Sequence, residues 1–96
     1  MSQHILKTQH EAWLAIEAGE KRFEVRRNDR FFQRGDTVVL RKLREGTDYY
    51  ETDPNGGRFS TRDLTFRIGW MLQGGQFGIE PGFCVFQLEP IEEAEA

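Results

Sequence analysis

The chain has 96 residues, of which 38% are hydrophobic and 30% are charged, and its formal net charge is −3. This length is enough for one domain with a single core, and the composition is typical of a globular protein and excludes disorder outside the ends. The apolar stretches are short and interrupted by charge, so we expect no membrane span, no signal peptide and a cytoplasmic location.

A short strand carrying His4 and Lys7 is expected first, followed by a helix. Thr8 and Glu11 have the spacing of a capping box, in which the threonine oxygen accepts from an orphan amide of the first turn. The helix is expected from Gln9 to Ala18, with Gly19 as a left-handed C-terminal cap. Its predicted apolar face consists of Ala12, Trp13, Leu14 and Ile16.

After Gly19 the hydrophobic period changes from 3.6 to 2, which predicts a strand. Phe23 and Val25 fall on one face of this strand, and Arg22, Glu24 and Arg26 fall on the other. We expect the apolar pair to point inward and the charged face to point outward.

The remaining pattern predicts strands separated by turns. In chain order we expect a turn at 33–36, a strand at 37–43, a hairpin turn at 53–57 approached by 49–52, a core strand at 64–72, a glycine-rich loop at 73–82 and a closing strand at 83–88. Along the core strand the predicted inward residues are Leu64, Phe66, Ile68, Trp70 and Leu72. The single cysteine, Cys84, lies between Phe83 and Val85 and is expected to be a core thiol.

Several short strands and one early helix predict an α+β fold, a small closed or nearly closed β-barrel with the helix packed at its side. We expect residues 1–88 to form this domain. Residues 89–96 carry four glutamates and are expected to be a disordered acidic tail.

Positive charge is concentrated in one part of the chain. Nine of the 13 basic residues lie between Glu20 and Arg44, against four acidic residues in the same segment. Such a cluster in an otherwise acidic chain suggests an anionic partner. We expect Arg22, Arg27 and Arg34 to be solvated surface residues.

Four segments resemble the ASCH family of the PUA-like superfamily, in particular its bacterial and phage branch of single-domain proteins of unknown function. They are His4-Ile5-Leu6-Lys7, Gly19-x-Lys21-x-Phe23-Glu24-x-Arg26-x-Asn28-Asp29-Arg30, Gly35-Asp36 and residues 73–85, so the resemblance covers residues 3–88. It implies a barrel of five to six mostly antiparallel strands, a cleft beside the helix, and binding of RNA or nucleotides. Some relatives are hydrolases that act on modified nucleosides or on RNA. The nucleoside-amide hydrolases among them carry a threonine, their proposed nucleophile, at the position of Glu24, so the resemblance leaves this enzyme assignment without its nucleophile.

Lys21, Glu24 and Arg26 are the central candidate site residues. The guanidinium of Arg26 can donate two hydrogen bonds to a phosphate in bidentate geometry. The carboxylate of Glu24 can only accept hydrogen bonds, for example from a base or a sugar hydroxyl. Alternatively, Glu24 pairs with Lys21 or Arg26 and locks the barrel.

Further candidates surround this set. Lys7, Arg30 and His4 are candidate ligand-binding residues, although His4 also suits a structural imidazole. Asn28 and Asp29 are expected to shape the turn and support Arg26. Phe77, between glycines, either stacks on a base or covers the core, and the weaker stacking candidates are Tyr49, Tyr50 and Phe59.

Three functions follow as hypotheses. The first is an RNA- or nucleotide-binding module, the second a protein-interaction accessory module, and the third a small hydrolase with Lys21 or Glu24 as general base. No cofactor and no metal site is expected, because His4, His10 and Cys84 do not complete an ordinary zinc set.

Overall fold

The computed structural model describes residues 1–53, 55–56 and 60–91. It contains one helix and five strands, in the order β1 (Gln3–Thr8), α1 (His10–Glu17), β2 (Phe23–Arg27), β3 (Thr37–Lys42), β4 (Asp63–Gln73) and β5 (Phe83–Pro90). The prediction of a small α+β domain with an early helix is therefore confirmed.

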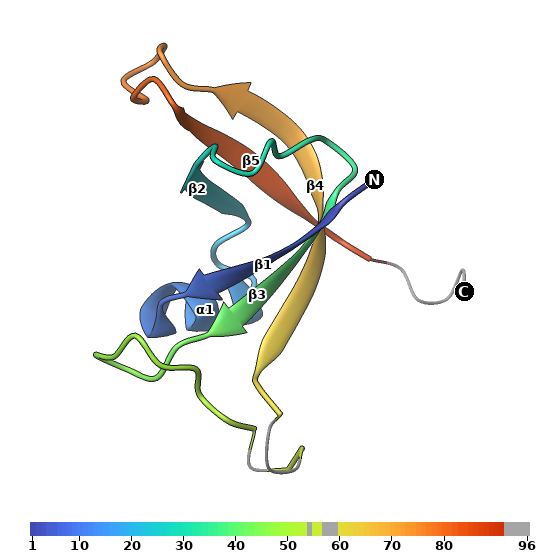
Figure 1. Cartoon of the computed structure of the whole chain (residues 1–96), viewed down its shortest axis with the longest axis vertical. Helices are drawn as coiled ribbons and strands as arrows, with labels where there is room; N and C mark the ends of the chain where they lie inside the picture. The colour runs from blue at the N-terminus through green and yellow to red at the C-terminus, as the bar shows by residue number, and fades with distance from the viewer. Residues whose placement is uncertain (54, 57–59, 92–96) are drawn as a thin grey trace.

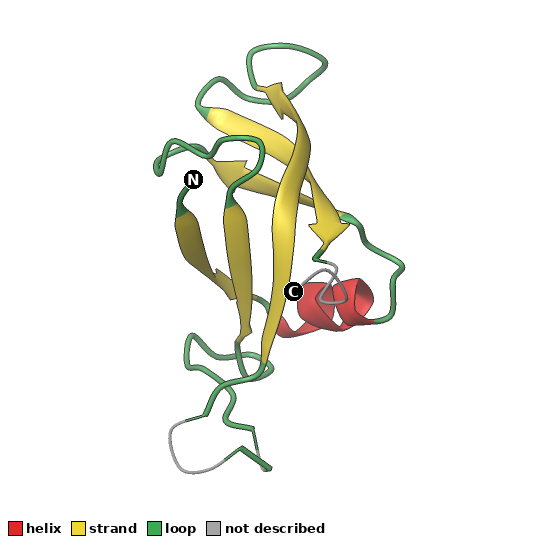
Figure 2. Cartoon of the chain, turned by 90° about the vertical axis from the view of Figure 1, so that its right-hand side faces the viewer, coloured by secondary structure: helices red, strands yellow, loops and turns green. Residues whose placement is uncertain are grey.

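The five strands form one curled sheet in the order β1-β3-β4-β5-β2 (Figure 1). β1 pairs with β3 in parallel, and the other three pairings are antiparallel. Because β1 and β2 are the two edges of the sheet, the backbone ladder does not close, and the structure is a half-barrel. The long strand β4 pairs with β3 along its first half and with β5 along its second half. In the side view it runs from one end of the sheet to the other (Figure 2).

Helix α1 is attached to the sheet through Trp13 and Ile16, both buried. The indole Nε1 of Trp13 donates to the carbonyl of Leu40 on β3 at 2.9 Å, and both side chains belong to the main hydrophobic core. Leu14, which the sequence placed on the apolar face, is exposed. A helix of only eight residues covers the sheet with a narrow stripe, and Leu14 lies outside that stripe.

The predicted capping box is wrong. The cap residue of α1 is Gln9, without a side-chain hydrogen bond, because Thr8 is the last residue of β1. The buried Thr8 hydroxyl instead donates to the carbonyl of Leu6 at 3.1 Å. At the other end of the helix, Gly19 has φ +80°, as expected for a left-handed cap.

The predicted alternation along β4 holds only in its first half. Leu64, Phe66 and Ile68 contact the core, but the pairing with β5 shifts between Ile68 and Met71. After this irregularity Met71 packs against the core and Trp70 is exposed. A bulge reverses the inward and outward positions that follow it, and its position depends on the partner strand.

Strand β5 directs Cys84, Phe86 and Leu88 into the core. Cys84 is a buried thiol, as predicted, and desolvation raises its pKa. The strand extends two residues beyond the predicted Leu88, so Glu89 and Pro90 belong to the sheet. Residues 92–96 of the predicted tail lie outside the described residues.

Helix α1 is too short to cross a membrane, and no other helix occurs in the described part of the chain.

Candidate nucleotide-binding cleft

A cavity of about 360 Å³ lies between the end of β1, the first turn of α1 and the edge strand β2. Its lining consists of Lys7, Thr8, Gln9, Ala12, Lys21, Glu24, Val25 and Arg26. The structure thus brings together Lys7 and the three central candidates, Lys21, Glu24 and Arg26. Thr8, Gln9, Ala12 and Val25 were not predicted as lining residues, because only the pairing of distant strands brings them to the cavity.

Glu24 points inward and is only 4% exposed, whereas Phe23 and Val25 are 47% and 51% exposed. The predicted orientation of β2 is therefore wrong. The alternation is real, but on this strand the interior side is the charged side. Burial of the carboxylate is compensated by two cations, because Lys21 Nζ and Arg26 Nε each lie 2.6 Å from one of its oxygens.

Arg26 connects the two edges of the half-barrel. Besides Glu24, its guanidinium donates to the carbonyl of Lys7 at 3.0 Å and to the hydroxyl of Thr8 at 3.3 Å. Arg30, in the loop after β2, donates in the same way to the carbonyl of Ile5 at 2.8 Å. Two arginine side chains thus bridge the seam where a closed barrel would have a backbone ladder.

Lys21 lies at the rim of the same cleft. Its ammonium donates to the carbonyl of Phe23 at 2.7 Å and lies 4.8 Å from the centre of the Phe23 ring. Both oxygens of Glu24 already accept hydrogen bonds from Lys21 and Arg26. The two residues that the hydrolase hypothesis names, Lys21 and Glu24, are thus paired with each other.

The helix adds partial positive charge to this cavity. The cap residue Gln9 and Ala12 of the first turn line the cleft, and the side chain of Gln9 makes no capping hydrogen bond. The N-terminus of a helix favours anions, because its amides are unsatisfied and its dipole is positive there. Lys7 stands opposite on β1, half-exposed, with a long 3.5 Å contact to Asp48.

The other basic residues of the 20–44 segment divide into two groups. Arg41 pairs with Asp63 on the neighbouring strand β4, and Lys42 pairs with Glu51 in the segment between β3 and β4. Five exposed arginines make no ion pair with any described residue: Arg22, Arg27, Arg30, Arg34 and Arg44.

His4 does not line the cleft. It is buried, its Nε2 lies 2.9 Å from Asp36 Oδ2, and its ring contacts Phe32 edge-on. Asp36 also accepts from the backbone N–H groups of Ser2 and Gln33. The pair joins β1 to the loop before β3. Of the two roles expected for His4, ligand binding and a structural imidazole, this position fits the structural one.

The pH dependence of stability should reflect this pair. Burial by itself raises the pKa of Asp36, but the hydrogen bonds from His4, Ser2 and Gln33 together lower it below its ordinary value. A lowered native pKa stabilises the fold above the unfolded pKa of about 4, and this contribution disappears as the pH falls below it. In urea unfolding, Asp36→Asn should therefore be less stable than wild type at neutral pH, and the difference should shrink below about pH 4. A difference that is constant with pH would contradict this role.

Asn28 shapes the loop after β2, as predicted. Its side-chain oxygen accepts from the N–H of Phe32, its amide donates to Gln73 at 3.2 Å, and its own N–H donates to Gly82. Asp29 is exposed. Neither residue contacts Arg26 through a hydrogen bond. The predicted support of Arg26 comes instead from Glu24, Lys7 and Thr8.

Three of the predicted stacking aromatics, Phe77, Tyr49 and Tyr50, do not line the cleft. Phe77 is exposed in the loop between β4 and β5 and has φ 53°, a conformation that costs energy for a non-glycine residue. Tyr50 lies under the guanidinium of Arg41 and Tyr49 is exposed. Phe59 lies outside the described residues.

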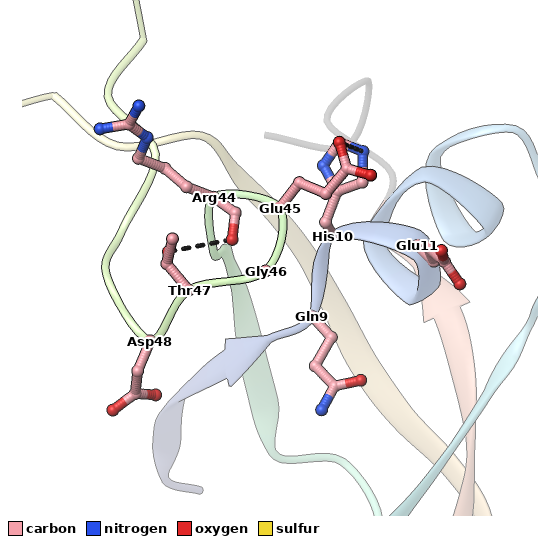
Figure 3. Close-up of a pocket in the computed structure, with 8 residues that line it drawn as sticks. All are labelled: Gln9, His10, Glu11, Arg44, Glu45, Gly46, Thr47 and Asp48. Atoms are coloured by element: carbon pink, nitrogen blue, oxygen red, sulfur yellow. Dashed lines mark hydrogen bonds and ion pairs between the residues drawn. The ribbon is translucent and has the colours of Figure 1, made fainter.

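A second cavity, of about 460 Å³, lies on the other side of the α1 N-terminus, against residues 44–48 (Figure 3). Its one charged contact joins His10 Nε2 and Glu45 Oε2 at 3.8 Å. Figure 3 shows the side chains of Arg44, Asp48 and Glu11 pointing away from one another. This cavity has more acidic than basic residues and no converging set, so it suits an anion less well. Within residues 1–53, 55–56 and 60–91, no group of three or more His, Cys, Asp or Glu side chains could hold a metal ion.

Comparison with known proteins places the chain in a family. A search of the curated proteins found none with significant similarity. One family model matches residues 3–88, nearly the whole described chain, and its description is "Domain of unknown function (DUF3850)". The protein therefore belongs to the DUF3850 family.

Proposed function

We propose that this domain binds RNA or nucleotides, with a phosphate group in the cleft between β1, α1 and β2. The observation that carries the proposal is the charge of the cavity lining. Lys7, Lys21 and Arg26 stand against the single carboxylate of Glu24, in a chain whose formal net charge is −3. A cavity of about 360 Å³ is within the size range of small-molecule sites.

The arrangement suits recognition better than catalysis. Both carboxylate oxygens of Glu24 are engaged in ion pairs, and these pairs hold Lys21 and Arg26 at fixed positions on the two sides of the cavity. The uncapped amides of α1 supply further donors. A bound phosphate would add a second anion beside a group that carries an excess of positive charge.

We further propose that the domain is of the ASCH type within the PUA-like superfamily. Two observations support this proposal. Lys21, Glu24 and Arg26 of the motif Gly19-x-Lys21-x-x-Glu24-x-Arg26 line the cleft. The sheet is curled and has five strands, and the helix lies beside that cleft. A protein-interaction role is the alternative.

Lys7→Glu is the cleanest test of the cleft, since Lys7 is half-exposed and its one ion contact with a described residue is long. The variant should bind adenosine monophosphate and single-stranded oligonucleotides at least about 10-fold more weakly, because it reverses one charge in the phosphate site. Wild-type affinity should fall with added salt, and the variant should show a smaller salt dependence. Isothermal titration at two salt concentrations measures both effects.

Arg67→Glu provides the matched control, because Arg67 is an exposed cation on β4 that does not line the cleft. Its affinity for adenosine monophosphate should stay within about 2-fold of wild type, as expected for a surface charge away from the cleft. Equal losses for both variants would indicate a general charge effect, and no loss for Lys7→Glu would contradict binding in the cleft. Arg26→Ala is a poorer probe, since Arg26 also holds Glu24 and the seam.

A further inference from the structure

The outer face of β2, β5 and β4 is apolar and lies next to the cleft. Val25 pairs with Val85, and Val85 pairs with Leu72, so these three side chains form a row across the strands on one face. The same face continues along the strands by the two-residue period. Its members are Phe23, Val25 and Arg27 on β2, Phe83, Val85 and Gln87 on β5, and Trp70 and Leu72 on β4.

This face is open to solvent. Phe23 and Val25 on β2 and Trp70 at the β4 bulge are 47%, 51% and 56% exposed. Large apolar side chains that are exposed next to one another indicate a binding surface, whereas single exposed apolar residues occur on the surface of any protein.

Cations border the aromatic rings. Lys21 Nζ lies 4.8 Å from the centre of the Phe23 ring, and the guanidinium carbon of Arg27 lies 5.0 Å from the centre of the Phe83 ring. None of these eight residues is acidic, and the next residue of β5 on this face, Glu89, places its carboxylate over Gly69 at the edge of the patch. Aromatic rings beside fixed cations match a ligand that alternates flat apolar groups with negative charges, as nucleotides in a single strand do.

The face and the cleft are continuous across the edge strand β2. Val25 belongs to the face and also lines the cleft, and Lys21 contacts both Glu24 in the cleft and Phe23 on the face. A nucleic-acid strand that has one phosphate in the cleft can therefore cross β2 and stay in contact with positively charged side chains.

We infer that the outer face of β2, β5 and β4 binds single-stranded nucleic acid by stacking bases on Phe23 and Trp70. The inference rests on the proposed function, because it extends the same ligand from the cleft onto the face. It adds that the ligand is a single strand rather than a free mononucleotide. Duplexes are disfavoured, since their bases are already stacked and paired.

The test compares wild type with a Phe23→Ala/Trp70→Ala variant, using fluorescein-labelled single-stranded oligoadenylate, the corresponding duplex and adenosine monophosphate as probes. The variant should bind the single strand at least about 30-fold more weakly, because it removes two stacking rings and each stacked base typically contributes ~1 to 3 kcal/mol. Its affinity for adenosine monophosphate should change by less than about 3-fold, because neither side chain lines the cleft and Lys21 keeps its ion pair with Glu24 when the Phe23 ring is removed. Tyr49→Ala is the matched control, because Tyr49 is an exposed aromatic outside this face.

Tryptophan fluorescence gives a direct readout of stacking. The chain has two tryptophans, and Trp13 is buried while Trp70 is exposed. Oligoadenylate should quench the emission of wild type. Trp70→Phe should lose most of this quenching but keep its affinity, since a ring remains for stacking.

The outcomes separate this inference from the proposed function. Wild-type affinity of the double variant for the single strand would overturn the stacking face and leave the cleft proposal standing. So would self-association of wild type in ultracentrifugation that the double variant abolishes, which would identify the face as an interface between copies. If neither adenosine monophosphate nor the oligonucleotide binds wild type, both proposals fail.

Discussion

Replacing Glu24 by alanine should lower the free energy of unfolding by about 3 kcal/mol, because it leaves two partly buried cations without their shared anion. Lys21 and Arg26 both lie 2.6 Å from this carboxylate, which is almost completely shielded from water. The expected loss in unfolding free energy lies at the lower end of the range for buried ion pairs, because each cation is about one quarter exposed. Urea unfolding followed by circular dichroism measures the change.

Glu17→Ala is the control for a surface ion pair, since Glu17 is half-exposed and lies 3.7 Å from Arg62. Its effect should be below about 1 kcal/mol. Should Glu24→Ala cost no more than Glu17→Ala, the triad of Lys21, Glu24 and Arg26 would not hold β2 in place. The double-mutant cycle with Lys21→Met then measures the coupling directly.

Trp13→Ala should lower the free energy of unfolding by about 3 to 5 kcal/mol, the usual range for removing a large buried aromatic side chain. Trp13 is the main attachment of α1 to the sheet, through core packing and its hydrogen bond to Leu40. A shorter side chain would leave a cavity between helix and sheet. The midpoint of thermal unfolding should fall accordingly.

Two variants separate the sources of this effect. Trp13→Phe keeps an aromatic ring in the core but leaves the Leu40 carbonyl without its donor, so the loss should be only about 1 to 3 kcal/mol. Leu14→Ala, at the exposed neighbouring position, should cost less than about 1 kcal/mol. A loss at Leu14 as large as that at Trp13 would mean that α1 packs on the sheet through a different face.

Local patterns in the sequence were enough to predict most elements. The helix, the strands after Gly19 and Asp36, the long strand from Leu64 and the closing strand all depend on hydrophobic periodicity, and they appear within a few residues of the predicted positions. Cys84 was correctly predicted as a core residue, although Phe83 and Val85, on which that prediction rested, lie on the opposite face of β5. The set of Lys7, Lys21, Glu24 and Arg26 at one cavity was also anticipated, with the family resemblance contributing to that prediction.

Other features depended on contacts between distant segments. Periodicity shows that Phe23 and Glu24 lie on opposite faces of β2, but it does not show which face meets the interior. That was decided by Lys21 and Arg26, which compensate the buried carboxylate, and by β5, which pairs β2 at the edge of the sheet.

The sequence by itself therefore determined the class of fold, the order of the elements and the cluster of charges near Gly19, because these follow from local spacing. Only the tertiary structure decided that the sheet stays open as a half-barrel, that Arg26 and Arg30 bridge its seam, and that Phe23 and Trp70 face solvent. The reason is that strand pairing, the β4 bulge and burial of charge are set by partners far away in the chain.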